Sequence, residues 1–306
     1  MQNKRVGLID ADGHNFPNLA LMKLSAYHKD IGDSVEFVNY WDTYDKVYIS
    51  KVFSFSPNPL LDHVIQAKEV ILGGTGWMDK FISTKRELPQ DIEHMYPDYA
   101  LYPRFEYALG FLTRGCGRGC DFCIVREKEG DCHHVSDLDE FWRGQREIKL
   151  LDPNLLAYRD REVLLKQLIK SKARIDFTQG LDIRLLCDKD TIDLVKKIRV
   201  KRVHFAYDEM KNSGIIEACL SNFKKHTNWG RNKVSVYVLT NFNSTIEEDL
   251  HRIEFCKSLD FTPYVMIYDK HNLLPGSVYY KLQKWCNNPL FLYTNTFDNF
   301  VRTMYK

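Results

Sequence analysis

The chain has no apolar run that approaches the ~20 residues needed for a membrane-spanning helix. Its first residues, Met1–Arg5, lead directly into the strand-like segment Val6–Ile9, without the apolar core or small-residue cleavage site of a signal peptide. It also has no internal repeat of about 20–50 residues and no low-complexity tract. We therefore expect a cytoplasmic protein that is not embedded in a membrane.

An excess of one charge sign is also lacking, because 43 Lys and Arg residues nearly balance 41 Asp and Glu residues, for a net charge of +2. Basic and acidic residues are not balanced in every part of the chain. Residues 159–202 carry 13 basic and 7 acidic side chains. Such a run is expected of a surface that binds an anionic partner such as nucleic acid. Solvated helix faces produce similar runs, so the sequence leaves both interpretations open.

The length of 306 residues predicts about two domains, and 13% aromatic residues supply enough apolar surface for folded cores. The first part alternates between strand and helix patterns. The predicted strands are Lys4–Asp10, Ser34–Val38, Val47–Ser50 and Glu69–Leu72, and the predicted helices are Leu19–Lys29 and a segment from Pro59 to Lys68. This alternation predicts a flavodoxin-like parallel-sheet domain over residues 1–100, followed by a linker at Pro89–Pro103.

The second part repeats the alternation more regularly. Its predicted strands are Ala108–Leu112, Ile148–Leu151, Arg174–Thr178, Val203–Tyr207, Val234–Leu239 and Tyr264–Tyr268. Between them we expect helices that begin at an Asp160 cap, at an Asp190 cap and at a Ser244–Glu247 capping box. Six βα units predict an α/β domain with a partial (β/α)6 TIM-like barrel over residues 105–290, and a short tail over residues 291–306.

Eight cysteines carry the most chemical information. Cys187, Cys219, Cys256 and Cys286 stand singly and are expected to pack as small hydrophobic side chains. The other four lie within seventeen positions, at Cys116, Cys120, Cys123 and Cys132.

The spacing Cys-x-x-x-Cys-x-x-Cys of the first three follows the first strand of the second part. Three thiolates in a glycine-rich loop suit a 4Fe-4S cluster whose fourth iron stays open. Arg114 and Arg118 would help to offset its negative charge. The alternative is a zinc site completed by Cys132, His133 or His134, although the second Cys-x-x-Cys pair typical of zinc ribbons is missing.

The cysteine loop, with Phe122 directly before the third cysteine, resembles the signature of the radical S-adenosylmethionine superfamily. The resemblance covers most of residues 105–290. It implies that Cys116, Cys120 and Cys123 hold a 4Fe-4S cluster and that the amino and carboxylate groups of S-adenosylmethionine chelate the open iron. Reductive cleavage would then give a 5′-deoxyadenosyl radical that abstracts hydrogen from a substrate.

By the same resemblance, cofactor contacts would come from the carboxyl ends of the strands. Phe122 would lie beside the adenine, Gln179 would reach ribose hydroxyls, and Arg184 would meet the methionine carboxylate. Many relatives have a glycine-rich turn after the second strand. This chain has Asp152 and Asn154 there, and the resemblance implies that one of them, Asp152 or Asn154, substitutes for that turn. The remaining candidates, Asp208 and Asn241, follow the fourth and fifth strands. Each of these polar residues has an alternative role as a helix cap or surface group.

Residues 1–100 resemble, more weakly, the cobalamin-binding-like domain that precedes many radical barrels. Asp12-Gly13-His14 stands where cobalamin proteins carry Asp-x-His-x-x-Gly, but Pro17 replaces the glycine. Proline fixes the backbone and removes an amide where the loop must pass the corrin. Cobalamin is therefore possible, and we expect it not to bind.

Taken together, these features predict a radical S-adenosylmethionine enzyme with an unknown substrate and a low-potential electron donor, a flavodoxin or ferredoxin. The rival from another class is a non-catalytic module that binds zinc and nucleic acid. A radical enzyme that modifies RNA is the intermediate case.

Overall fold

The computed structural model describes the chain except for residues 1–2, 14, 63, 78–86 and 304–306. The chain divides into two compact units. Unit 1 comprises Met1–Tyr107 together with Asp139–Arg143, and unit 2 comprises Ala108–Leu138 and Gly144–Lys306. Both units are built on parallel sheets, so the predicted α/β class is confirmed.

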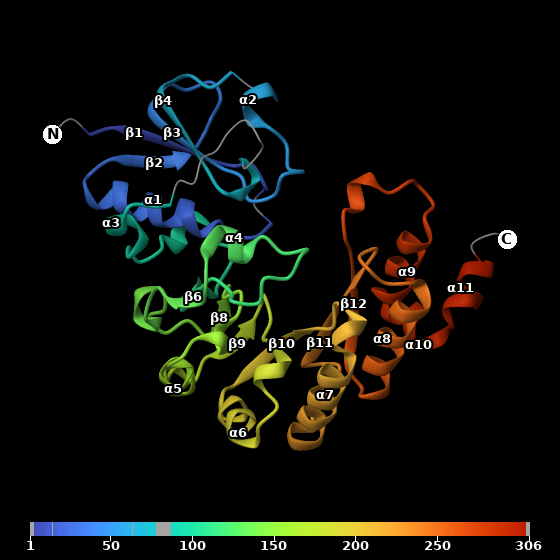
Figure 1. Cartoon of the computed structure of the whole chain (residues 1–306). Coiled ribbons are helices and arrows are strands. Elements are labelled where there is room, and N and C mark those ends of the chain that lie inside the picture. The colour runs from blue at the N-terminus through green and yellow to red at the C-terminus, as the bar shows by residue number, and fades with distance from the viewer. Residues whose placement is uncertain (1–2, 14, 63, 78–86, 304–306) are drawn as a thin grey trace. The chain divides into compact units, whose positions relative to one another are not determined.

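Unit 1 contains a four-stranded parallel sheet in the order β2-β1-β3-β4 (Figure 1). Its strands are β1 (Arg5–Asp10), β2 (Ser34–Phe37), β3 (Tyr44–Ser50) and β4 (Ala67–Gly73). Alternate residues of β1 enter different cores. Val6 and Leu8 pack with helix α1 (Leu19–Asp30), whereas Ile9 packs with β3 and Trp77. The sheet is thus apolar on both faces, as expected when helices or loops cover both sides.

Two predictions for unit 1 are wrong. The helix expected to reach Lys68 stops early, because α2 spans only Pro59–Asp62 and β4 begins at Ala67. The stretch Pro89–Pro103 is not a linker. It forms α3 (Gln90–Glu93) and the 3-10 turn η2 (Tyr99–Leu101), and Ile92 is buried in the core beside α1.

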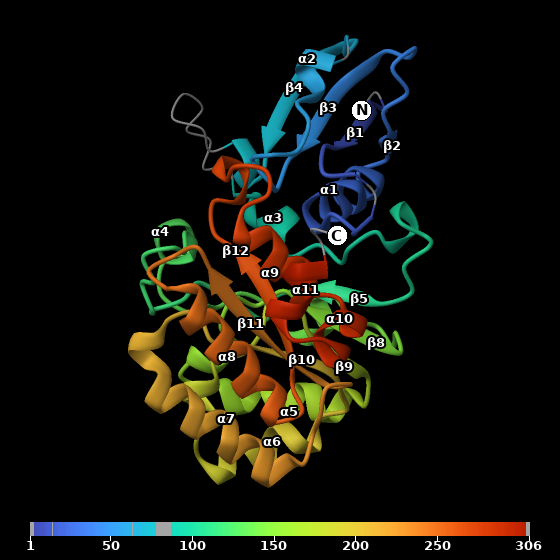
Figure 2. The same cartoon turned by 90° about the vertical axis from the view of Figure 1, so that its right-hand side faces the viewer.

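Unit 2 is built on a six-stranded sheet in the order β12-β11-β10-β9-β8-β5, and each strand lies beside its neighbour in the sequence. All six predicted strands are confirmed. They are β5 (Ala108–Gly110), β8 (Glu147–Leu150), β9 (Arg174–Phe177), β10 (Val200–Ala206), β11 (Val234–Thr240) and β12 (Thr262–Ile267). Helices α5 (Arg161–Ser171), α6 (Lys189–Lys197), α7 (Ser213–Thr227) and α8 (Ile246–Ser258) connect them from β8 onward (Figures 1 and 2).

The helix starts in unit 2 differ slightly from expectation. Helix α6 is capped by Asp188, which accepts from the Thr191 amide at 2.7 Å, and not by Asp190. The capping box of α8 joins Thr245 to Glu248, one residue later than predicted. Asp160 does occupy the N-cap of α5, but its side chain makes no capping hydrogen bond.

The single cysteines divide into two kinds. Cys256 and Cys286 are buried and pack as small apolar side chains, as expected. Cys187 and Cys219 instead form a disulfide, because the turn η5 (Ile183–Leu185) brings their Cα atoms to 4.9 Å. Their separation of 32 residues gave no local signal of this pairing.

The C-terminal residues beyond α9 (Val278–Cys286) form α10 (Pro289–Thr294) and α11 (Phe297–Thr303). Leu292, Phe297 and Phe300 pack around Trp285, whose indole nitrogen donates to the Asn295 carbonyl oxygen at 3.1 Å. In the described part of the chain, none of these helices combines the length and apolar character required to cross a membrane.

A fully buried arginine braces the centre of the unit 2 sheet. The Arg252 guanidinium donates to the carbonyl oxygens of Tyr207 at 2.7 Å and Leu239 at 2.8 Å, and it pairs with the equally buried Asp249. It therefore links α8 to the carboxyl ends of β10 and β11.

We expect Arg252→Ala to lower the free energy of unfolding by about 3–5 kcal/mol, because it leaves the Asp249 carboxylate buried without its cation. Urea unfolding followed by circular dichroism measures this loss. Arg302→Ala, which removes an exposed cation from α11, is the control and should change stability by less than about 0.5 kcal/mol. A loss below about 1 kcal/mol for Arg252→Ala would contradict the bracing role.

Candidate functional site: the cysteine loop

The three closely spaced cysteines lie on a loop that a short antiparallel ribbon closes at its base. Strand β6 (Thr113–Arg114) pairs with β7 (His133–His134), so the ends of residues 115–132 are held together. The loop follows β5, at the carboxyl end of that strand, as predicted. Within it, helix α4 (Val125–Glu129) follows the third cysteine.

Glycine is required where the loop turns next to the first cysteine. Gly115 has a φ of +79°, and a Cβ atom on it would lie 2.4 Å from the Asp131 carbonyl oxygen. The adjacent Cys116 amide donates to the Gly130 carbonyl oxygen at 2.9 Å. The two sides of the loop therefore approach too closely for any side chain at position 115.

Asp152 supports the start of the loop from beneath. Its side chain is 3% exposed and accepts from the Thr113 amide at 2.6 Å and the Thr113 hydroxyl at 2.7 Å. Both carboxylate oxygens also lie 3.2 Å from the Leu112 amide. Burial raises the pKa of Asp152 to about 6. We expected a cofactor contact here. In the structure this carboxylate accepts hydrogen bonds from the backbone at the start of the loop, so Asp152 acts as a positioning residue.

Asn154 lies between two thiols. Its Nδ2 donates to the Cys116 sulfur at 3.3 Å, and its backbone carbonyl oxygen accepts from the Cys132 thiol at 3.4 Å. The residue is 4% exposed, and its side-chain oxygen is buried without a hydrogen-bond partner. Burial raises the pKa of the Cys132 thiol to about 11. Cys132 is thus a protonated thiol engaged with the backbone.

Cys120 lies among charged groups from neighbouring strand ends. Burial raises its pKa, the charges of Cys123 and Asp208 add to that increase, and the Arg184 guanidinium opposes it. Burial likewise raises the pKa of Asp208 to about 6, against the lowering influence of Arg252 and Arg184. Cys120 is therefore influenced by the charges of Cys123, Arg184 and Asp208.

One residue that sequence reasoning missed connects the loop to the turn after β9. Asp182 accepts from Arg118 Nε at 2.6 Å through one carboxylate oxygen and from Arg184 Nε at 2.8 Å through the other. Arg118 belongs to the cysteine loop, so this carboxylate ties the loop to the turn η5. The sequence offered one indication of this role, because Asp182 is an acidic residue only two positions before Arg184.

Aromatic side chains connect the loop with the segments that follow β11 and β12. The Phe122 ring lies 5.4 Å from that of Phe242, which in turn lies 4.9 Å from Tyr268. Asn241 has a φ of +64° and donates from Nδ2 to the Tyr268 carbonyl oxygen at 2.9 Å, so its amide stabilises this turn. Gln179 is exposed.

Neither predicted metal site is assembled as a set of ligands in the described residues, where no three His, Cys, Asp or Glu side chains are placed to hold a metal ion. The histidines of the zinc alternative point elsewhere. His133 contacts the Asp131 carbonyl oxygen at 2.9 Å, and His134 lies 3.3 Å from Asp137. Cys116, Cys120 and Cys123 remain on one loop as free thiols.

In unit 1, the cobalamin-like motif is only partly described, because His14 lies outside the described residues. Asp12 accepts from the backbone amides of Val52 at 2.6 Å and Phe53 at 3.0 Å, and from the Ser56 hydroxyl at 2.6 Å. Both of its carboxylate oxygens therefore organise the loop after β3.

The raised pKa of Asp152 makes its stabilising contribution depend on pH. The folded state favours the protonated carboxyl, so stability is greatest below the ordinary pKa of 3.8 and falls as the pH rises through about 6. Asp152→Asn cannot ionise. We therefore expect the free energy of unfolding of wild type minus that of Asp152→Asn to decrease between about pH 4.5 and about pH 7.5. Urea titrations at both pH values measure the difference, and a constant difference would contradict the assignment.

Comparison with protein-family models and with curated protein sequences finds no match for this chain. Its function must therefore be inferred from the residues and contacts described above.

Proposed function

We propose that this chain is a radical S-adenosylmethionine enzyme whose 4Fe-4S cluster is held by Cys116, Cys120 and Cys123, and that the six βα units of unit 2 form the partial barrel of that superfamily. The observation that carries the proposal is the position of the three-cysteine loop. It follows the first strand of a singly wound parallel sheet, and Cys120 shares its surroundings with Arg184 and Asp208 from later strand ends. Open α/β sheets bind ligands at this edge.

The residues present fit such a cluster. Three thiols with no disulfide partners supply the donor atoms, and thiolates are the usual ligands of iron–sulfur clusters. Next to the first thiol, the buried side-chain oxygen of Asn154 has no hydrogen-bond partner, so it can accept a donor from a bound group. A 4Fe-4S cluster with S-adenosylmethionine supplies one-electron cleavage to a 5′-deoxyadenosyl radical, which abstracts a hydrogen atom.

The protein's own groups would then orient the cofactor. Arg184 is held by Asp182 with its guanidinium near Cys120, where it suits a carboxylate such as that of methionine. Asp208 supplies an acceptor on the same side for an amino group or hydroxyl. Phe122, backed by Phe242, offers an apolar ring for an adenine, and the exposed Gln179 side chain is available to ribose hydroxyls.

The proposal also requires a low-potential electron donor, a flavodoxin or a ferredoxin, because the first step consumes one electron. Of the three thiols, Cys123 is exposed, whereas Cys116 and Cys120 are partly buried.

We expect anaerobically purified protein to contain about four irons per chain and to form 5′-deoxyadenosine with S-adenosylmethionine and dithionite. Cys116→Ala, Cys120→Ala or Cys123→Ala should each abolish both properties, because each removes one of three ligands. Iron and sulfide analysis and product chromatography provide the measurements.

Cys132→Ala is the matched control for these variants. Its thiol donates to the Asn154 carbonyl oxygen, so we expect this variant to keep its iron and its 5′-deoxyadenosine formation. Iron loss from Cys132→Ala together with bound zinc in the wild type would refute the proposed ligand set and revive the four-ligand zinc site.

We further expect no cobalt in protein purified from cells supplied with cobalamin. The Asp12 carboxylate is bonded to Val52, Phe53 and Ser56, and Pro17 stiffens the loop that would have to deliver His14. Metal analysis and the visible spectrum test this. Stoichiometric cobalt with a spectrum that changes in His14→Ala would show the expectation to be wrong.

A further inference from the structure

The amino ends of the parallel strands of unit 2 share one edge of the sheet, opposite the edge that bears the cysteine loop. The segments that run from the helices into β8–β12 are residues 146–147, 170–174, 196–202, 224–233 and 257–262, and we call them together the basic edge. They contain fourteen Lys and Arg residues and only two acidic residues, Glu147 and Asp260. Within these five segments the charge is therefore mostly positive, and just outside them Asp193 and Glu254 pair with Lys196 and Lys257.

The helix dipole accounts for part of this excess. Six of the fourteen cations lie in the last turns of α5, α6, α7 and α8, where a positive charge stabilises a helix. The other eight follow the helix ends, in the loops and first strand residues. The helix dipoles therefore do not account for these eight cations. Ion pairs within the edge account for two of them, because Lys201 pairs with Glu147 and Arg231 pairs with Asp260.

The two acidic side chains do not neutralise the edge. Glu147 pairs with Lys201 at 2.5 Å, and Asp260 pairs with Arg231 at 2.6 Å. Lys172, Arg174 and Arg199 are all exposed, and Arg199 donates to the carbonyl oxygen of Lys172 at 2.8 Å. That bond attaches the Arg199 side chain to the backbone of the neighbouring loop, which carries Lys172 and Arg174.

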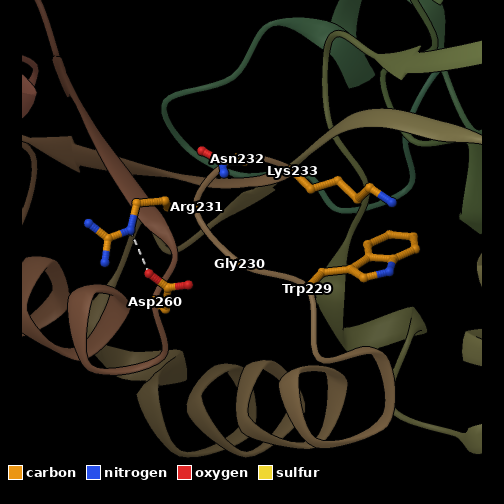
Figure 3. Close-up of a pocket in the computed structure, with 6 residues that line it drawn as sticks. All are labelled: Trp229, Gly230, Arg231, Asn232, Lys233 and Asp260. Atoms are coloured by element: carbon orange, nitrogen blue, oxygen red, sulfur yellow. Dashed lines mark hydrogen bonds and ion pairs between the residues drawn. The ribbon is translucent and has the colours of Figure 1, made fainter.

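A pocket of about 390 Å³ opens at the same edge, between the end of α7 and the start of β11 (Figure 3). Figure 3 shows Arg231 with Asp260 on one side of the loop and Lys233 with Trp229 on the other. The Lys233 ammonium lies 4.4 Å from the Trp229 ring centroid. The volume is within the range of about 300–1,000 Å³ that is typical of pockets for small ligands.

We propose that the basic edge binds a single-stranded polynucleotide, with phosphates along the exposed cations of residues 170–202 and one base against Trp229. Such grooves combine positive charge that follows the backbone with aromatic rings on which bases stack. A lipid surface fits less well. None of the large apolar side chains exposed in the described part of the chain falls in the five segments. The inference holds whether or not the cysteine loop carries a cluster.

The test uses the full chain and a fluorescein-labelled oligouridylate of about 20 nucleotides, followed by fluorescence anisotropy between about 50 and about 200 mM KCl. We expect the affinity to fall as salt rises. Each phosphate contact contributes about 0.7 to the slope of log K against log salt concentration. Lys172→Gln/Arg174→Gln/Arg199→Gln should therefore lower the slope by about 2 and weaken binding at least about tenfold at low salt.

The matched control is Lys166→Gln/Lys284→Gln/Arg302→Gln, which removes the same charge from exposed positions outside the basic edge. It should bind almost as tightly as the wild type. Trp229→Ala should weaken binding about fivefold or more at constant salt, whereas Trp229→Phe should keep most of the affinity. Circular dichroism verifies that each variant is folded. If Trp229→Ala does not fold, the affinities of the two triple variants test the proposal.

Three results would overturn the proposal. The first is no binding at the lowest salt concentration, and the second is an equal loss in both triple variants, which would reflect net charge alone. The third is binding to phosphatidylserine vesicles as tight as binding to the oligonucleotide, which would assign the edge to a membrane surface.

Discussion

The buried carboxylate of Asp152 is the contact on which the candidate site depends. It follows β8, and its oxygens take the amides of Leu112 and Thr113 just before the cysteine loop begins. A buried carboxyl group is costly unless donors surround it, and here they come from the backbone of a different βα unit. The loop therefore cannot shift relative to the second strand without leaving this group unsatisfied. Asn154, two residues later, extends the same constraint to the first thiol.

The strands of this protein could be predicted because their sequences are short and mostly apolar, with several buried residues each, as in Val203–Tyr207 and Val234–Leu239. The α/β class then followed from their alternation with helices. Helix limits were harder to predict, because the choice between Asp188 and Asp190 as a cap depends on backbone angles that the pattern does not encode. The prediction of a helix from Pro59 to Lys68 was wrong at its end, because α2 stops at Asp62 and β4 already begins at Ala67. The spacing of apolar residues in this segment does not distinguish a long helix from a short helix followed by a strand.

The candidate site was predictable where one loop carries the chemistry and unpredictable where groups meet from distant segments. The spacing of Cys116, Cys120 and Cys123 indicated a set of metal ligands. Arg184 and Asp208 became candidates because they follow predicted strands. The roles of Asp152 and Asp182 required the structure, since each depends on which backbone or guanidinium lies opposite. No feature of the sequence indicated that Arg252 of α8 is fully buried, which the structure shows. The pairing of Cys187 with Cys219 depends in the same way on how η5 meets α7.

The composition of unit 1 has a consequence for biosynthesis. Residues 139–143 belong to this unit although they follow β5 and the whole cysteine loop in the sequence. They are bound there by the Tyr99 hydroxyl, which donates to the Phe141 carbonyl oxygen at 2.6 Å, and by Glu140, which lies 2.7 Å from His94. A ribosome must therefore deliver the cysteine loop before unit 1 can be completed. The cysteine loop lies between the two segments of unit 1 in the sequence, so a gene cut at residue 107 would leave unit 2 whole but would separate residues 139–143 from the rest of unit 1.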